Sequence, residues 1–254
     1  MSLLEQAIRK MSGEGSVSSL SYQNSSLIDE IDTMSTSFKL TNEQLINKKI
    51  IYPSFKNNSL VNSFRELRTS VATKFNRNVV LITSIDSKSG VSYFSRNLAA
   101  AIAFDSSKTS ILLDCNLKKK SSSATFDLLD KNGVCNFITD SSTNVEDIIH
   151  ESGIARFRVV PYGNTKVPVT EAFSHPRFYS LINQLKQKYN DRFVIVDAPP
   201  LFTSADARIL LDVCDQVILV VPYGKNNKED IENAARMIGV DKLTGVVFNE
   251  FSGG

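Results

Sequence analysis

Short, almost continuous apolar runs recur through the chain and are separated by longer segments with helical spacing. Runs such as VVLIT, SILLD and QVILVV have no polar face, so both faces of the strands they predict must be buried. A parallel sheet covered by helices on both sides buries strands in this way. We expect strands at Val79–Ser84, Ser110–Cys115, Arg158–Pro161, Phe193–Asp197, Val217–Val221 and Gly245–Asn249.

Segments between these runs repeat apolar residues at intervals of three and four, which predicts helices. The first begins at Ser59, and its apolar positions are Leu60, Phe64, Leu67, Val71 and Phe75. Further helices are expected at Val91–Phe104, Pro176–Tyr189, Ser204–Leu211 and Lys228–Ile238. Alternating strands and helices predict a three-layer α/β fold with a mainly parallel sheet.

The first 58 residues have a different pattern. Residues 1–12 place apolar side chains on one face of a short helix, which docks either on its own domain or on a partner or membrane surface. Residues 13–37 are Ser-rich and predict a flexible linker, and residues 38–58 are expected to be extended or irregular. The expected organisation is therefore an N-terminal arm, 1–58, followed by one domain, 59–254.

Composition narrows the class of protein. The 254 residues carry a net charge of +2, which gives no support for a nucleic-acid partner. Three cysteines without C-x-x-C spacing indicate a reducing compartment. We find neither a signal-peptide pattern nor 18 consecutive apolar residues, so we expect a soluble cytoplasmic protein without a transmembrane segment. Metal-ligand spacing for zinc and hydrolase motifs are also absent.

The segment between the first predicted strand and the next helix is a short polar loop, Thr83–Gly90. A strand, a tight loop and a helix N-terminus together form an anion site, because their backbone N–H groups converge. The expected phosphate-loop pattern is G-x-x-x-x-G-K-[ST], but Val91 stands at the lysine position. The residues expected to cradle phosphates are Ser87, Lys88, Ser89, Gly90, Val91, Ser92 and Tyr93.

Two other predicted strands end in aspartate, at Asp114 and Asp197. Ligands in open α/β sheets lie at the carboxyl ends of the strands, where such carboxylates can hold Mg²⁺. We expect Asp114, Asp197 and Ser92 to hold the metal if one binds. The alternative is that each aspartate caps the following turn.

The order of these motifs resembles that of the bacterial tyrosine kinases (BY-kinases) of capsular and exopolysaccharide synthesis, relatives of the ParA/MinD ATPases within the P-loop fold. The resemblance covers about residues 59–250. It rests on SFRELRTSV (Ser63–Val71), the loop region around Gly90, ILLDCNLKKK (Ile111–Lys120), GVCNFI (Gly133–Ile138), VVPYGN (Val159–Asn164) and FVIVDAPPLFTSADARIL (Phe193–Leu210). The DAPP turn followed by SADA is the most specific part.

This resemblance implies partners and further roles. A membrane polysaccharide co-polymerase or chain-length protein would offer its cytoplasmic tail as the docking partner and recruit the chain to the inner face of the membrane. Arg65 and Arg68 would contribute to a ring of like domains, and Asn249 would lie near the nucleotide base. ATP or ADP with Mg²⁺ would be the ligand.

Departures from the family pattern occur at functional points. Val91 replaces the lysine, Asn116 replaces the second acid of the strand motif, and Asn62 replaces a leading glutamate. The final residues, NEFSGG, carry no tyrosine cluster. We therefore predict a pseudokinase that binds nucleotide weakly or not at all.

Two alternatives remain open at this point. One is an active protein-tyrosine autokinase with Lys88 as a substitute for the missing lysine and with Asp114 and Asp197 as catalytic residues. The other is a ParA/MinD-type positioning ATPase, for which the N-terminal segment gives slight support and against which the SFRELRTS segment speaks.

Overall fold

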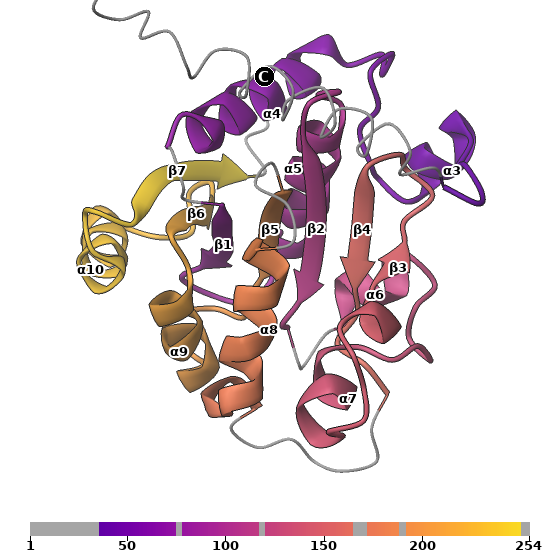
Figure 1. Ribbon diagram of the computed structural model, residues 1–254. Helices are drawn as coiled ribbons and strands as arrows, with labels where there is room; N and C mark the ends of the chain where they lie inside the picture. Colours follow the sequence, from indigo (N-terminus) through magenta and orange to yellow (C-terminus); the bar gives the residue numbers. More distant parts are fainter. Residues whose placement is uncertain (1–35, 75–77, 117–119, 165–171, 188–191, 250–254) are drawn as a thin grey trace, which may run out of the picture. The chain divides into compact units, whose positions relative to one another are not determined.

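A parallel sheet forms the centre of the chain in the computed structural model, which describes residues 36–74, 78–116, 120–164, 172–187 and 192–249. Its seven strands lie in the order β3-β4-β2-β5-β1-β6-β7, and every pair is parallel except β3 with β4 (Figure 1). The strands are β1 Val79–Ser84, β2 Thr109–Asp114, β3 His150–Glu151, β4 Phe157–Val160, β5 Arg192–Asp197, β6 Gln216–Pro222 and β7 Leu243–Asn249. All the expected strands are present, with ends shifted by one or two residues.

Strands β1, β2, β5 and β6 are buried on both faces, which explains their continuous apolar sequences. In β1, Val79 and Leu81 point into one hydrophobic core, while Val80 and Ile82 point into the other. Each core is closed by helices on its own side of the sheet. The predicted three-layer α/β fold is therefore confirmed.

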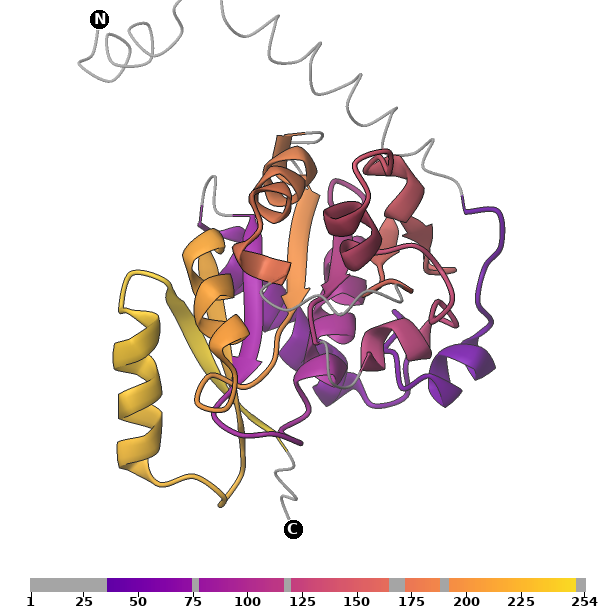
Figure 2. The same cartoon turned by 90° about the horizontal axis from the view of Figure 1, so that it is seen from below.

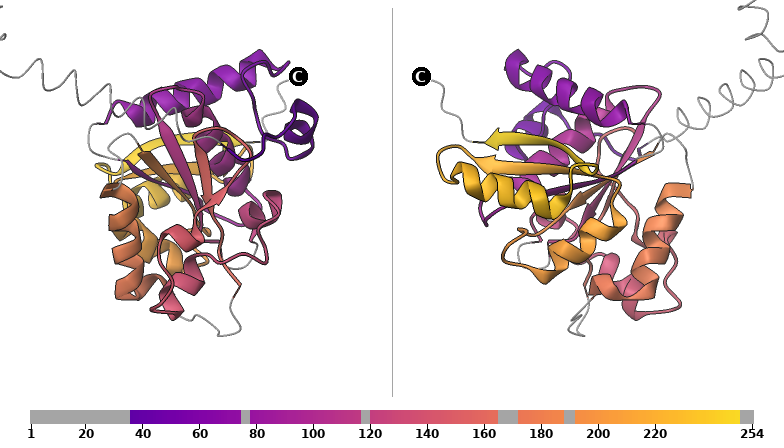
Figure 3. Two further views of the ribbon diagram at one scale, coloured as in Figure 1. Left: turned by 45° about the vertical axis from the view of Figure 1, so that its right-hand side comes forward. Right: turned by 90° about the vertical axis from the view of Figure 1, so that its left-hand side faces the viewer.

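Helices α4 (Asn58–Ala72) and α5 (Val91–Ala103) cover one face of the sheet. Helices α8 (Pro176–Gln187), α9 (Ala205–Val213) and α10 (Lys228–Ile238) pack on the opposite core (Figure 3). Figure 2 shows α10 and β7 at one edge of the sheet, far from the β3–β4 hairpin at the other edge. Among the described residues, no helix is both long enough and apolar enough to span a membrane.

Several short elements were not expected from the sequence. They are α6 Ser121–Thr125, α7 Val134–Thr139, the 3₁₀ turns Glu146–Ile148 and Ala172–Ser174, and the two-residue strand β3. Each is shorter than two helical turns or one ordinary strand, so a periodic pattern cannot develop within it. Their positions depend on packing against the sheet instead.

Residues 36–58 differ from the prediction. We expected residues 38–58 to be extended or irregular, but α3 (Asn42–Asn47) is a helix. Its capping box explains the difference, because Thr41 Oγ1 accepts from the Gln44 N–H and Gln44 Oε1 accepts from the Thr41 N–H. The compact unit begins at Thr36, ahead of the boundary expected at Ser59. The predicted helix 1–12 and most of the predicted linker lie outside the described residues.

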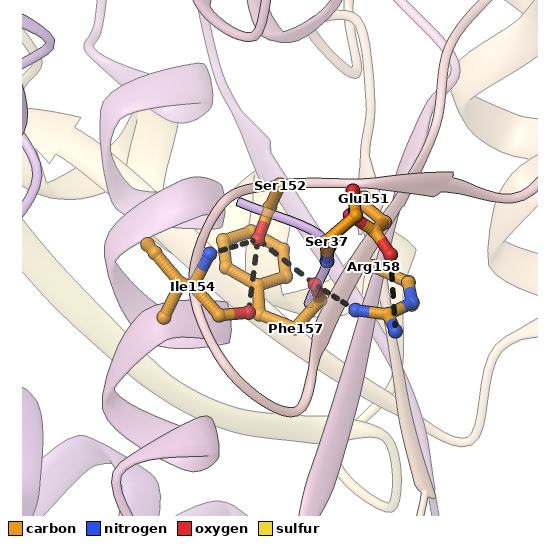
Figure 4. Close-up of polar contacts among 6 residues, drawn as sticks. All are labelled: Ser37, Glu151, Ser152, Ile154, Phe157 and Arg158. Atoms are coloured by element: carbon orange, nitrogen blue, oxygen red, sulfur yellow. Dashed lines mark hydrogen bonds and ion pairs between the residues drawn. The ribbon is translucent and has the colours of Figure 1, made fainter. Parts of the chain in front are cut away.

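The start of this unit is tied to the sheet edge. Ser37 donates hydrogen bonds from its N–H and hydroxyl to Glu151 of β3, and Arg158 of β4 lies 4.0 Å from the same carboxylate (Figure 4). In the turn between these strands, the Ser152 hydroxyl donates to the Phe157 carbonyl and accepts from the Ile154 N–H. The hairpin thereby has its polar groups satisfied at the exposed edge.

Asn97 of α5 joins the segment before α4 to the domain. Its side chain accepts from the Ile51 N–H at 2.7 Å and donates to the Lys49 carbonyl at 3.0 Å and the Tyr93 carbonyl at 2.9 Å. Asn97 is fully buried, and Ile50 and Ile51 are buried in the same core. The segment is therefore a built part of the domain.

We expect Asn97→Ala to lower the free energy of unfolding by about 2 to 4 kcal/mol, because it leaves buried backbone groups unpaired. Urea denaturation measures this loss. Asn62→Ala, on the exposed surface of α4, is the matched control and should change stability by less than about 0.5 kcal/mol. Equal effects of the two variants would contradict the structural role of Asn97.

Candidate functional site

The loop between β1 and α5, residues 85–90, has two left-handed positions. Lys88 has φ +66° and Gly90 has φ +88°. A side chain at position 90 would collide with the amide of Asn249, so glycine fits both the backbone and the space. The loop is thereby held tightly at the N-terminus of α5, which has no side-chain cap.

Side chains behind the loop fix its path. Asn249 donates to the Ser89 carbonyl at 3.0 Å, and Asn226 donates to the Asp86 carboxylate at 2.8 Å. The Ser89 hydroxyl donates to the Asp86 carbonyl at 2.7 Å. Asn249 does not line the adjoining pocket, so in this structure its contact is with the loop. Its expected place near a nucleotide base stays a prediction.

A pocket of about 710 Å³ opens above the loop. Ser87–Tyr93, the whole set expected to cradle phosphates, lines it. On the other walls lie Asn116, the DAPP turn (Ala198–Pro200) and Asp206 of α9. Pockets of 300–1,000 Å³ typically hold small ligands and cofactors. The volume is therefore large enough for a nucleotide.

Asp114 and Asp197 lie side by side, because they are paired residues in the register of β2 and β5. Both are fully buried, and neither lines the pocket. Asp114 accepts from the Ser123 N–H at 2.8 Å and from the Ser123 hydroxyl at 2.6 Å. The Ser122 hydroxyl donates to Asp197 at 2.6 Å. Helix α6, which the sequence analysis missed, thus covers the acidic pair.

The electrostatics of this pair favour protons. Burial raises the pKa of Asp114. Burial, and then the negative charge of Asp114, raise the pKa of Asp197 to about 7, although hydrogen bonds from Ser122 and Ser92 and the positive charge of Arg96 oppose the shift. Oδ1 of Asp197 is buried without a hydrogen-bond partner, so a proton or a metal ion would satisfy it.

By donor type, Ser92, Asp114 and Asp197 are the residues that could hold Mg²⁺. The pKa of Asp197 is raised to about 7, so the metal would have to compete with a proton there. Among the described residues, no group of three His, Cys, Asp or Glu side chains could hold a metal ion.

Position 91, where the phosphate-loop pattern has lysine, is occupied by an apolar side chain that is also buried in the structure. Val91 is 7% exposed and belongs to the core on the α5 side. Lys88 is exposed on the loop and lines the pocket. Arg96, which the sequence analysis missed, also lines the pocket and is 8% exposed. Its spacing of four from Ser92 on one helix face was the signal that could have identified it.

Arg65 and Arg68, the residues expected to support assembly, lie on α4. Arg65 is exposed, and its guanidinium lies 3.4 Å from the Asn62 side-chain oxygen. Arg68 is half-buried and donates to the Ala101 carbonyl at the end of α5 at 3.3 Å. The two arginines thus differ, since Arg68 already has a contact within its own chain.

Comparison with curated proteins agrees with the motif order. The putative tyrosine-protein kinase CapB of Staphylococcus aureus is 29% identical over 192 residues, which is 74% of this chain and 82% of CapB. The tyrosine-protein kinase CpsD of Streptococcus agalactiae serotype Ia is 28% identical over 193 residues, 74% of this chain and 82% of CpsD. The chain is a homologue of bacterial tyrosine-protein kinases. No family profile matches it.

Other homologues of this tyrosine-kinase group are much longer. The tyrosine-protein kinase Wzc of Salmonella typhi is 26% identical over 196 residues, and the matched region makes up only 26% of Wzc.

The chimerical protein CapA2B2 is 25% identical in sequence, with a TM-score of 0.68 over 83% of this chain and 91% of that chain. The resemblance to the BY-kinases is therefore confirmed by sequence.

More distant structures show the fold alone. The kinase domain of the Escherichia coli tyrosine kinase ETK has a TM-score of 0.68 at 21% identity, covering 88% of this chain and 92% of that domain. The cell-division ATPase MinD of Pyrococcus furiosus has a TM-score of 0.55 at 19% identity, covering 68% and 70%. The tyrosine-kinase homologue therefore has a P-loop NTPase fold.

The raised pKa of Asp197 predicts a pH dependence of stability. Between about pH 4 and about pH 7 the folded protein holds a proton that the unfolded chain has lost, so the free energy of unfolding falls as pH rises through this window. Urea denaturation should show this decline in the native protein and a flatter profile in Asp197→Asn. Asp130→Asn, on the surface, controls for net charge. Parallel profiles for all three proteins would contradict the prediction.

Proposed function

We propose that this protein is a kinase-like regulatory protein of capsular or exopolysaccharide biosynthesis or export. It binds ATP or ADP weakly and transfers no phosphate. It acts in the cytoplasm at the inner face of the membrane, through the cytoplasmic tail of a membrane co-polymerase. The observation that carries the proposal is Val91, a buried apolar side chain at the lysine position of the phosphate loop.

Loss of the lysine removes the charge that stabilises the leaving phosphoryl group. Phosphoryl transfer depends almost entirely on positioning and on such electrostatic contacts. Removing one contact of this kind typically costs about 3 to 4 kcal/mol of transition-state stabilisation. Val91 packs with the core residues Phe94 and Leu98, so it offers no polar atom in compensation.

The acidic pair supports the same proposal. A Mg²⁺ ion bound to Asp114 and Asp197 would have to replace the hydroxyl contacts of Ser123 and Ser122 or share their oxygens. It would also have to displace the proton that the raised pKa of Asp197 favours near neutral pH. Weak metal binding is therefore expected, and ATP binds P-loop proteins as its magnesium complex.

The partner is proposed from the relatives. Wzc is about four times as long as the region it shares with this chain, and CapA2B2 is a chimerical protein. In Wzc, the region shared with this chain is joined to further polypeptide. By analogy with such relatives, we take a membrane co-polymerase as the polypeptide with which this kinase-like domain associates.

An active autokinase is the second candidate. It is favoured by one observation, since Lys88 lines the pocket at the tip of the loop and is exposed enough to move. It requires phosphotyrosine on the purified protein and its loss in Asp114→Ala. The fold shared with MinD does not by itself favour a positioning ATPase.

The first experiment is calorimetric titration of ATP and ADP with Mg²⁺ into the native protein and Val91→Lys. Restoring the lysine should strengthen ATP binding by roughly 10- to 100-fold, because a charge-assisted contact to phosphate is regained. Val91→Met, which fills the space without charge, is the matched control. Phosphotyrosine should be absent from the native protein by mass spectrometry.

Two outcomes would contradict this proposal. Phosphotyrosine that forms in the native protein with ATP and disappears in Asp114→Ala would move the autokinase to first place. Equal ATP affinity in the native protein, Val91→Lys and Val91→Met would show that the lysine position has no influence on the ligand.

Assembly is tested on α4. Arg65→Ala should shift the protein to smaller species in analytical ultracentrifugation if Arg65 contacts a neighbouring copy, because its side chain is exposed. Arg236→Ala on α10 is the matched control, since Arg236 also bonds an asparagine three residues earlier. The same distribution of species for the native protein and both variants would exclude a role of Arg65 in assembly.

A further inference from the structure

Among the residues that the structure describes, two cationic side chains line the pocket above the loop, Lys88 and Arg96. Lys88 lies at the exposed tip of the loop, where water screens its charge. Arg96 projects from α5 and is 8% exposed, so its charge acts in a much less polar environment. The two side chains are therefore unequal candidates for binding an anion.

The contacts of Arg96 leave part of its guanidinium available. Nη1 donates to the Ser92 carbonyl at 3.1 Å, and the guanidinium carbon lies 5.4 Å from the centre of the Tyr93 ring. Nε is buried and has no hydrogen-bond partner. Within the part of the chain that the structure describes, Arg96 forms no ion pair at 4.0 Å or less. A buried cation with an unpaired N–H is costly unless an anion satisfies it.

The surroundings of Arg96 indicate where that anion would lie. Burial lowers the pKa of Arg96, and the carboxylate of Asp197 raises it, so these two groups lie close enough to interact. Arg96 and the uncapped first turn of α5, residues 91–93, line the same pocket. The N–H groups of that turn and the guanidinium therefore converge on one volume, and both favour negative charge.

We propose that Arg96 supplies the positive charge that binds the phosphate groups of the nucleotide in this pocket, in place of the lysine that Val91 replaces. This inference rests on the proposed function in one respect, because it takes the ligand to be a nucleotide. It assigns to Arg96 the substitution for the missing lysine that the autokinase alternative assigned to Lys88. Arg96 lies more than one helical turn beyond position 91, so it approaches the phosphates from another side and contributes to binding.

A purely structural role is the competing explanation. The bond from Nη1 to the Ser92 carbonyl and the stacking on Tyr93 would by themselves hold Arg96 against its own helix. These two contacts do not explain why Nε is buried without a hydrogen-bond partner. The two explanations differ in what they predict for pyrophosphate, which carries the charge of a nucleotide but has no base or sugar.

The experiment measures binding of ATP and of pyrophosphate to the full chain by calorimetry, for the native protein and three variants. Arg96→Met removes the charge and keeps most of the volume, Arg96→Lys keeps the charge, and Lys88→Met removes the other cation. We expect Arg96→Met to weaken both ligands by roughly 10- to 100-fold. Arg96→Lys should bind more tightly than Arg96→Met, and Lys88→Met should weaken both ligands less than Arg96→Met does.

Folding is checked in parallel by near-UV circular dichroism and thermal melting of each variant. If Arg96→Met loses its native spectrum, Arg96→Gln, which keeps a polar side chain without the charge, takes its place in the comparison with Lys88→Met. Unchanged affinity in a folded Arg96→Met would overturn the inference, as would a larger loss in Lys88→Met. No binding of ATP or pyrophosphate to the native protein at millimolar concentration would overturn it as well.

These outcomes are separate from those of the proposed function. Phosphotyrosine formation would overturn the pseudokinase proposal and leave the role of Arg96 standing. Unchanged binding in Arg96→Met, without phosphotyrosine in the native protein, would overturn only the role of Arg96.

Discussion

The parallel pairing of β2, β5 and β1 is the constraint on which the site depends. It sets Asp114 beside Asp197, and Asp197 beside Ile82 of β1, just before the loop begins. Two carboxylates are thereby held together in a place that water does not reach. The structure relieves their repulsion with hydroxyl groups from α6, with Arg96, and with a pKa of Asp197 that is shifted upward.

This arrangement changes how the missing lysine is understood. In the sequence, Val91 is one of several departures from a known pattern. In the structure, it is one of several apolar residues that close the core beneath α5, and a positive charge that acts on Asp197 comes from Arg96, further along the same helix. The pocket therefore lacks the lysine of the pattern, but it is still lined by a positive side chain and by the N-terminus of α5, which has no side-chain cap.

Much of the fold could be predicted from the sequence because buried parallel strands are continuous apolar runs. The loop lining the pocket was also predictable, since its residues are contiguous. What could not be predicted depends on contacts between distant segments. Nothing local to Ser122 and Ser123 indicates that they hydrogen-bond to the two aspartates, and Asn249 is 159 positions beyond Gly90, against which it packs. In the sequence alone, Arg96 is one of several polar residues on a predicted helix.

Helix α5 has one further property, which follows from neighbouring residues that face different ways. Asn97 holds the backbone at Lys49 and Ile51, while Arg96 lines the pocket, and the two are adjacent in the chain. A rotation or slide of α5 that suited a ligand at Arg96 would stretch the two hydrogen bonds that join Asn97 to Lys49 and Ile51. Tension applied to the segment before α4 would, in the same way, be carried to the pocket wall, so this helix is a mechanical link between the two.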